Sequence, residues 1–123
     1  MQHDQSPKHG ELIPADNCDF FWDVEYQERH VEEVILRPRA SYREAFGDEP
    51  LRVGIVEFRI LLFLARWPYH AFTRRQISDA VSTESHFISE ASVDGHIASL
   101  RDQLGDFHDF VQSVPHVGYR FKP

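Results

Sequence analysis

The stretch Ser92-Val-Asp-Gly-His-Ile-Ala-Ser-Leu-Arg-Asp-Gln-Leu104 decides how this chain folds. Its apolar residues fall at positions i, i+4, i+7 and i+11, which places them on one face of an α-helix. Ser89 or Ser92 offers a hydroxyl to cap its start, and Gly105 is the residue type that ends helices. We predict a helix whose apolar stripe, Val93, Ile97, Leu100 and Leu104, faces a core. The positions expected on or near its solvent side are Ala91, Asp94, Ala98, Ser99, Arg101 and Asp102.

Two further helices are predicted upstream of this stretch. Ile55 to Trp67 is apolar almost all round and is followed by Pro68, a pattern that indicates a central, buried helix. Thr73-Arg-Arg-Gln76 has the form of a capping box, with a hydroxyl at the cap and Gln three residues later. It opens a second helix through Ile77 and Val81, and residues 82–89 form the loop that leads to the third.

Strands are predicted at both ends of the helical part. After the helices, Val111 to Val114, a turn at 115–118 and Tyr119 to Phe121 indicate a closing hairpin. Before them, residues 20–24, 31–36 and 40–46 are short aromatic or β-branched runs broken by acids and prolines, which favours a small antiparallel sheet. A helix is the competing interpretation for residues 24–36. Residues 1–18 are polar and without periodicity, so we expect a flexible tail.

Length and composition narrow the class of protein. The 123 residues fit one domain, and they contain neither a long apolar segment nor a secretory signal, so we expect a cytoplasmic protein without a membrane anchor. Cys18 has no second cysteine to pair with, and no two histidines have the spacing of metal ligands. Glycine-rich phosphate loops and nucleophile motifs are missing. We therefore expect no enzyme activity, cofactor or metal.

The charge is unevenly distributed along the chain. Residues 1–50 hold twelve acidic and five basic residues, whereas residues 51–123 hold eight of each, so the net charge of −7 lies in the first part. Proteins that bind DNA usually have a basic footprint, since contacts to phosphates supply much of their affinity. Neither half of this chain has one in bulk, which argues against strong DNA binding.

Helix, helix, loop, helix and hairpin is the order of a winged helix-turn-helix, and the residues resemble the OmpR/PhoB-type output domain of bacterial response regulators. The resemblance covers roughly residues 50–122. It rests on Pro50-Leu51 leading into Val56-Glu57-Phe58, on Phe72-Thr-Arg-Arg-Gln-Ile77, on Val93-Asp94-x-His96-Ile97-x-x-Leu100-Arg101 and on Gly118-Tyr-Arg-Phe121. It implies an α+β fold with a sheet of four strands before the helices. We divide residues 19–123 into an N-terminal sheet (19–53), three helices (54–105) and a wing hairpin (106–123).

The resemblance also implies how DNA would be contacted. The third helix, about residues 90–104, would lie in the major groove, and the wing, residues 111–121, would touch the adjacent minor groove. Arg101 matches a base-contacting arginine. Ser92, His96 and Tyr119 match phosphate-contacting positions, and Arg120 lies beside Tyr119 in the wing. The pair Arg74 and Arg75, at the start of the second helix, is a candidate phosphate clamp.

Several positions depart from the family pattern. Members commonly have Arg or Lys where this chain has Ala91, Ala98, Ser99 and Asp102, and Pro115 stands where the wing usually offers an arginine. Gly95 replaces a β-branched residue within the helix. Plainer interpretations also remain open: Arg101 as a solvated surface residue, His96 as a packing or hydrogen-bonding residue, and Tyr119 as part of the core.

Two functions compete at this point. In the first, the chain is a free-standing transcription regulator without a receiver domain, which binds double-stranded DNA weakly and gains affinity from a homodimer or a partner. In the second, the winged helix contacts a protein: an acidic surface containing Glu32, Glu33 and Asp48 docks a partner regulator or RNA polymerase, or mimics DNA. The order of the motifs favours the first, and the missing arginines favour the second.

Overall fold

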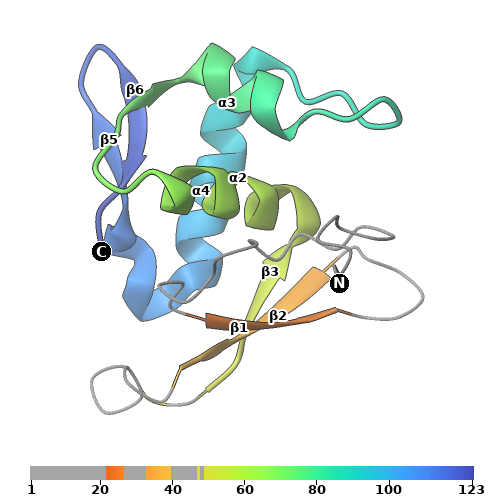
Figure 1. Ribbon diagram of the computed structural model, residues 1–123, viewed down its shortest axis with the longest axis vertical. Coiled ribbons are helices and arrows are strands. Elements are labelled where there is room, and N and C mark those ends of the chain that lie inside the picture. Colours follow the sequence, from red (N-terminus) through yellow and green to blue (C-terminus); the bar gives the residue numbers. More distant parts are fainter. Residues whose placement is uncertain (1–21, 27–32, 40–46, 48) are drawn as a thin grey trace, which may run out of the picture.

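Residues 22–26, 33–39, 47 and 49–123 are described by the computed structural model of the chain (Figure 1). An antiparallel sheet lies below a group of helices, and a C-terminal hairpin stands beside the helices. This arrangement confirms the predicted α+β winged helix-turn-helix. The predicted tail, residues 1–18, and the predicted strand at residues 40–46 lie outside the described residues.

The N-terminal sheet consists, within the described residues, of β1 (Trp22–Tyr26), β2 (Glu33–Pro38) and β3 (Leu51–Gly54), in the order β1-β2-β3 with antiparallel pairs. The helix considered for residues 24–36 is therefore wrong for the described part of that segment. In β2 the side chains of Val34 and Leu36 are fully buried, as expected for a strand that presents alternate residues to a core. Residues 51–53 fall within the segment assigned to the N-terminal sheet (19–53), but no separate strand was predicted at residues 51–54.

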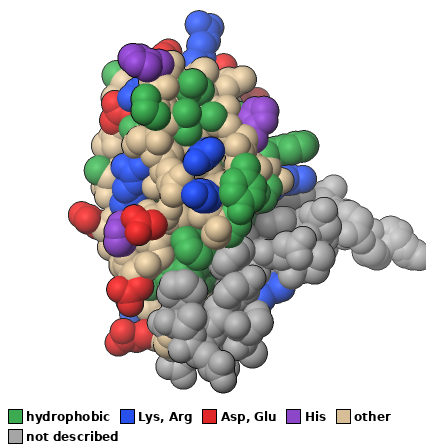
Figure 2. All heavy atoms as spheres, turned by 90° about the vertical axis from the view of Figure 1, so that its left-hand side faces the viewer, with side chains coloured by type: hydrophobic (Ala, Val, Ile, Leu, Met, Phe, Trp, Pro, Cys, Tyr) green, Lys and Arg blue, Asp and Glu red, His purple; other side chains and the backbone are tan. Residues whose placement is uncertain are grey.

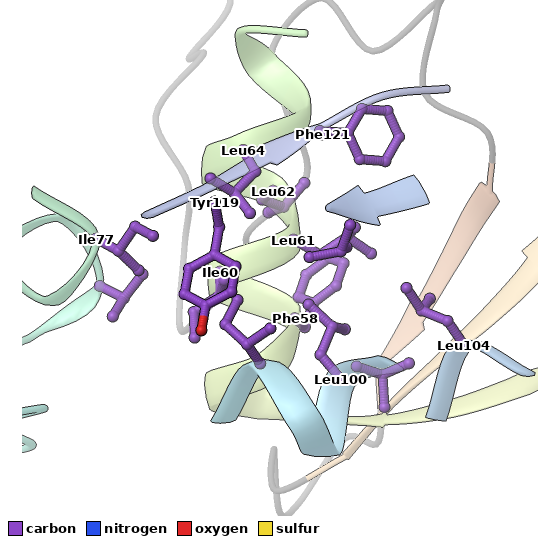
Figure 3. Close-up of a cluster of buried hydrophobic side chains, with 14 of the residues drawn as sticks. Phe58, Ile60, Leu61, Leu62, Leu64, Ile77, Leu100, Leu104, Tyr119 and Phe121 are labelled. Atoms are coloured by element: carbon purple, nitrogen blue, oxygen red, sulfur yellow. The ribbon is translucent and has the colours of Figure 1, made fainter. Parts of the chain in front are cut away.

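Helix α2 (Ile55–Arg66) runs through the centre of the domain. Its apolar residues face several directions because the sheet, α4 and the hairpin pack against different sides of it. Figure 3 shows these side chains meeting Leu100 and Leu104 from α4 and Tyr119 and Phe121 from the hairpin. The residues of α2 that are buried are Phe58, Ile60, Leu61, Leu62 and Leu64. The prediction of a central, buried helix is confirmed.

Helix α3 (Arg74–Val81) begins with the predicted capping box. The Thr73 hydroxyl accepts a hydrogen bond from the Gln76 backbone N–H at 3.0 Å, and the Gln76 side chain accepts one from the Thr73 N–H at 2.9 Å. Two of the backbone donors at the helix start are thereby satisfied. Ile77 and Val81 point to the core, and residues 82–89 contain no helix or strand.

The third helix has a short 3₁₀ turn in front of it. Ser89 caps that turn, η2 (Glu90–Ser92), by accepting from the Ser92 N–H, and α4 (Val93–Leu104) follows directly. Gly105 ends α4 with a φ of 58°, a conformation that glycine adopts without a steric penalty. The predicted stripe is confirmed, since each of its residues is at most 1% exposed: Val93, Ile97, Leu100 and Leu104.

A second 3₁₀ segment, η3 (Gly105–Phe110), leads into the hairpin formed by β5 (Val111–Val114) and β6 (Gly118–Phe121). The two-residue strand β4 (Phe72–Thr73) pairs with β6 and completes a sheet in the order β4-β6-β5. A Cβ at Gly118 would overlap the carbonyl oxygen of Phe72, so glycine is needed where β4 and β6 approach. The hairpin was predicted, whereas η3 and β4 were not.

Candidate nucleic-acid interface

Helix α4 has an outer face that is exposed in the described part of the chain. We use "outer face" for the exposed residues of η2 and α4 that lie opposite the buried stripe and have no hydrogen bond or ion pair from their side chains to another described residue: Ala91, Gly95, Ala98, Ser99 and Asp102. Their side chains are small or acidic, and none is basic. Figure 2 looks onto the side of the molecule that carries the hairpin, where Lys and Arg side chains are scattered among acidic, histidine, hydrophobic and uncharged ones. The surface therefore has no continuous basic field on this side.

Asp94 is the centre of a polar network between α3, α4 and the hairpin. Its Oδ1 accepts a hydrogen bond from the Tyr119 hydroxyl at 2.5 Å and forms an ion pair with Arg74 Nε at 2.7 Å. The guanidinium of Arg74 also lies 5.6 Å from the centre of the Tyr119 ring, within the range of a cation–π contact. Two residues predicted to contact phosphate are thus bonded to an acid of the same domain.

The electrostatics of this network follow from its hydrogen bonds. The pKa of Asp94 is lowered because the Tyr119 hydroxyl and the Arg74 guanidinium donate to its carboxylate. The pKa of Tyr119 is raised, first by burial of the ring and then by its hydrogen bond to Asp94. The pKa of Arg74 is raised because Asp94 accepts its hydrogen bond. All these shifts favour a charged aspartate, a charged arginine and a neutral tyrosine.

Arg101 connects α4 to the hairpin instead of extending into solvent. Its Nε donates to the Val111 carbonyl oxygen at 2.9 Å, and its Nη2 donates to the Ser113 hydroxyl at 3.0 Å. Its guanidinium lies 5.6 Å from the centre of the Tyr119 ring. The interpretation of Arg101 as a solvated surface residue is therefore wrong. The resemblance assigned Arg101 to base contact, and that assignment stays a prediction, with two of its donors already engaged within the domain.

His96 lies between α4 and the first turn of α2. Its Nδ1 is 2.7 Å from Glu57 Oε2, and the two side chains are only 27% and 12% exposed. About two helical turns further on, the Gln103 side chain accepts a hydrogen bond from the Gly54 N–H at 3.0 Å, which satisfies a backbone donor at the start of α2. His96 therefore holds two helices together, in agreement with its plainer interpretation.

Of the other residues predicted to contact DNA, some are hydrogen-bonded within the domain and one is not. The Ser92 hydroxyl donates to the Ser89 carbonyl oxygen at 2.8 Å, so it stabilises the start of the helix. Arg120 donates from Nε and Nη2 to the Gln112 side chain across the hairpin, at 3.3 and 3.2 Å. Arg75 is exposed on the first turn of α3 and has no ion pair or side-chain hydrogen bond to another described residue. Of the predicted cations, Arg75 is thus the one most accessible to a ligand.

Sequence reasoning missed the partners of these residues. Asp94, Glu57 and Gln103 were not candidates, although all three bind a residue or backbone group at the proposed interface. The only signal available in the sequence was that Asp94 and Glu57 fall within the matching motifs. Which residue each of them binds depends on how the helices cross, and no local pattern shows this.

Comparison with known proteins identifies the family. Residues 48–121 match the family described as "Transcriptional regulatory protein, C terminal". This chain belongs to that family. The phosphate regulon transcriptional regulatory protein PhoB of Escherichia coli (strain K12) is 37% identical over 99 residues, which cover 74% of this chain and 43% of PhoB. PhoB of Pseudomonas aeruginosa is 37% identical over 89 residues, 72% of this chain and 38% of that protein. The chain thus spans about two fifths of the length of these relatives.

Solved structures share the fold of this chain. The C-terminal domain of the nisin resistance regulator NsrR superposes with a TM-score of 0.59 at 16% identity and covers 81% of this chain and 92% of that one. The DNA-binding domain of the response regulator AdeR, in complex with an intercistronic region, gives a TM-score of 0.54 at 22% identity, with 80% and 93% covered. Both likenesses confirm the winged-helix architecture.

The alternative acidic surface of this regulatory domain is described only in part. Glu32 and Asp48 lie outside the described residues. Glu33 is exposed at the start of β2 and forms an ion pair with Arg52 at 3.3 Å. Within the described ranges, no group of three or more His, Cys, Asp or Glu side chains is placed to hold a metal ion, and no helix is long and apolar enough to cross a membrane.

Proposed function

We propose that this chain regulates transcription by binding double-stranded DNA, with η2 and α4 in the major groove and the β5–β6 hairpin in the adjacent minor groove. Membership of a family of transcriptional regulatory domains supports this proposal. The observation that carries it is that the outer face of α4 is unobstructed and beside a hairpin fixed to α4 by Arg101. A helix with a free face and a braced hairpin is the arrangement that winged helices use to reach two grooves at once.

The small side chains of the outer face favour a close approach to the bases. Gly95, Ala98 and Ser99 expose almost no side chain beyond a methyl or hydroxyl group, so α4 can lie deep in the groove and contact thymine methyl groups or hydrogen-bond base edges through Ser99. Asp102 has an acceptor only, which suits the amino group of cytosine. Specificity would then come from apolar contacts and single hydrogen bonds, and not from bidentate contacts of arginine to guanine.

Contacts to the phosphates of the DNA would come chiefly from the start of α3. Arg75 is exposed there, and the N-terminal end of a helix carries partial positive charge that favours a phosphate. Arg74 is less available because Asp94 already binds it. With so few cations we expect a weak dependence on salt and a low affinity for a single chain. Self-association or a partner protein would raise that affinity by holding two sites on one DNA.

Fluorescence anisotropy with labelled duplex DNA tests the proposal. We expect the wild-type chain to bind at about 50 mM salt and to lose affinity at about 200 mM, with a slope that corresponds to a few released counterions. Arg75→Gln is expected to weaken binding about three- to tenfold for every sequence and to reduce the salt slope by about one. Arg52→Gln is the matched control, because it removes the same charge from the N-terminal sheet and leaves α3 unchanged.

Two results would contradict this function. The first is a wild-type chain that binds no duplex at 50 mM salt. The second is equal weakening by Arg75→Gln and Arg52→Gln, which would mean that only the net charge matters and not the surface around α3 and α4. The competing function as a protein-docking module is not favoured by the family to which the chain belongs.

A further inference from the structure

The tip of the hairpin contains a strained histidine. Between β5 and β6 the Val117 N–H donates to the Val114 carbonyl oxygen at 3.0 Å, which closes a four-residue turn with Pro115 second and His116 third. His116 has a φ of 68°. Proline second and a positive φ third are the features of a type II turn, in which the third position is normally glycine or asparagine. A histidine there costs conformational energy that glycine would not.

A second turn of the same form occurs elsewhere in the chain, and there a contact to another element accounts for the positive φ. In the turn Trp67-Pro68-Tyr69-His70, the His70 N–H donates to the Trp67 carbonyl oxygen at 3.1 Å and Tyr69 has a φ of 69°. Tyr69 and His116 are the two non-glycine residues with positive φ among the described residues. The Tyr69 N–H also binds the Phe121 carbonyl oxygen at 2.8 Å, so its turn is fixed to the end of β6. Within the described part of the chain, the side chain of His116 has no hydrogen bond or ion pair that would explain its strained position.

The surroundings of His116 favour an anionic or hydrogen-bond-accepting partner. Residues 111–121 contain no acid, and their other basic residue, Arg120, is bonded to Gln112 in the body of the hairpin. Pro115, His116 and Val117 are all exposed. At the end of the molecule that carries the hairpin tip, Figure 2 shows histidine and hydrophobic side chains together on the surface. The tip therefore combines an exposed imidazole, which can donate a hydrogen bond, with two apolar neighbours of low flexibility.

We propose that His116 is the residue through which the hairpin contacts DNA, by donating a hydrogen bond to acceptors on the floor of the minor groove while Pro115 and Val117 lie against its walls. This inference rests on the proposed function, because it requires that the hairpin lies on a duplex. The acceptors are the N3 atom of adenine and the O2 atom of thymine, which A·T and T·A pairs present alike. The amino group of guanine stands in the same groove and obstructs a contact of this kind. The hairpin thus selects for segments without guanine amino groups and not for a defined sequence.

Inosine provides the probe that isolates this contact. An inosine–cytosine pair keeps the major-groove carbonyl and N7 of a guanine–cytosine pair and lacks only the minor-groove amino group. We expect the wild-type chain to bind a duplex rich in inosine–cytosine pairs about fivefold more tightly than its guanine–cytosine counterpart. His116→Gly is expected to remove that preference, to weaken binding to the inosine duplex about tenfold and, because glycine relieves the strained turn, to raise Tm by a few degrees.

Tyr69→Gly is the matched control. It relieves the same backbone conformation in a turn of the same form at the other end of β6, and it is expected to leave the inosine preference unchanged. His116→Arg, which restores a longer donor at the tip, is expected to bind at least as tightly as the wild type. A stable His116→Gly chain that keeps both wild-type affinity and the inosine preference would overturn the inference. A wild-type chain that binds neither duplex would instead overturn the proposed function, and the inference with it.

Discussion

The inner and outer faces of α4 differ in what holds their residues in place. The inner stripe is at most 1% exposed and packs against α2 and the N-terminal sheet. The polar residues that carry the family resemblance are also engaged within the domain, since Asp94 binds Arg74 and Tyr119, and Arg101 binds β5. Within the described part of the chain, the side chains of the outer face have no hydrogen bond or ion pair of this kind. The family signature in this chain therefore maintains the architecture, whereas the exposed residues of the outer face are those that depart from it.

The largest expected contrast is between two neighbouring residues of α4. Leu100→Ala removes a fully buried side chain beneath α2 and is expected to lower the free energy of unfolding by about 3 kcal/mol. Ser99→Ala, one residue away on the outer face, is expected to change it by less than about 0.5 kcal/mol. Urea denaturation of both variants measures the difference. Comparable losses would mean that the outer face is packed in the folded protein and would remove the basis of the comparison.

The inner stripe of α4 and the ends of the helices were predictable because the residues that specify them lie close together in the sequence. The apolar spacing in α4, the capping box at Thr73 and the glycine at 105 each involve residues within a few positions of one another, and the structure confirms all of them. The strand β3 was not predicted as a separate element within the N-terminal sheet (19–53), because residues 51–54 are a short run of mixed polarity next to a strong helix. They become a strand by pairing with β2, and that pairing is a tertiary contact.

The polar network of the candidate site was harder to predict for a related reason. Arg101 finds its partners ten and twelve residues later in sequence, on a strand whose position depends on η3, which was not predicted. Asp94 binds residues twenty and twenty-five positions away in opposite directions along the chain. A motif match identifies such residues as important, but only the crossing of α3, α4 and β6 shows that they bind one another.

Arg101→Lys distinguishes a brace from a simple positive charge. Lysine keeps the charge but cannot donate to the Val111 carbonyl oxygen and the Ser113 hydroxyl in a fixed geometry. We expect a loss of about 1–2 kcal/mol in the free energy of unfolding and weaker binding to all DNA sequences, because the hairpin is no longer held against α4. Urea denaturation and anisotropy measure the two effects. If Arg101 reads a base instead, discrimination will relax at a single base pair and stability will stay near that of the wild type.

Acid titration tests the role of Asp94, whose side chain is 55% exposed and nevertheless forms an ion pair with Arg74. Because its pKa is lowered in the folded state, Asp94 contributes stability above its unfolded pKa of about 4, and that contribution is lost as the pH falls through the folded value. We expect the free energy of unfolding of the wild type to exceed that of Asp94→Asn by about 1 kcal/mol at pH 7. The value is modest because solvent screens the exposed carboxylate. The difference is expected to shrink towards pH 3 in urea denaturation. A difference that stays constant between pH 7 and pH 3 would show that the charge of Asp94 has no part in the network.

The smallest expected effect concerns backbone freedom on the outer face. A Cβ at Gly95 would meet no atom within 4 Å, so Gly95→Ala is expected to stabilise α4 by about 0.5–1 kcal/mol through helix propensity alone. Ala98→Gly, one turn along the same face, is expected to cost a similar amount. If neither position packs against anything, the double variant will have nearly wild-type stability, since independent effects add. Thermal unfolding of the two single variants and the double variant measures these effects. If Gly95→Ala were less stable than the wild type, the added methyl group would be meeting a neighbour, and the face of α4 at Gly95 would not be open.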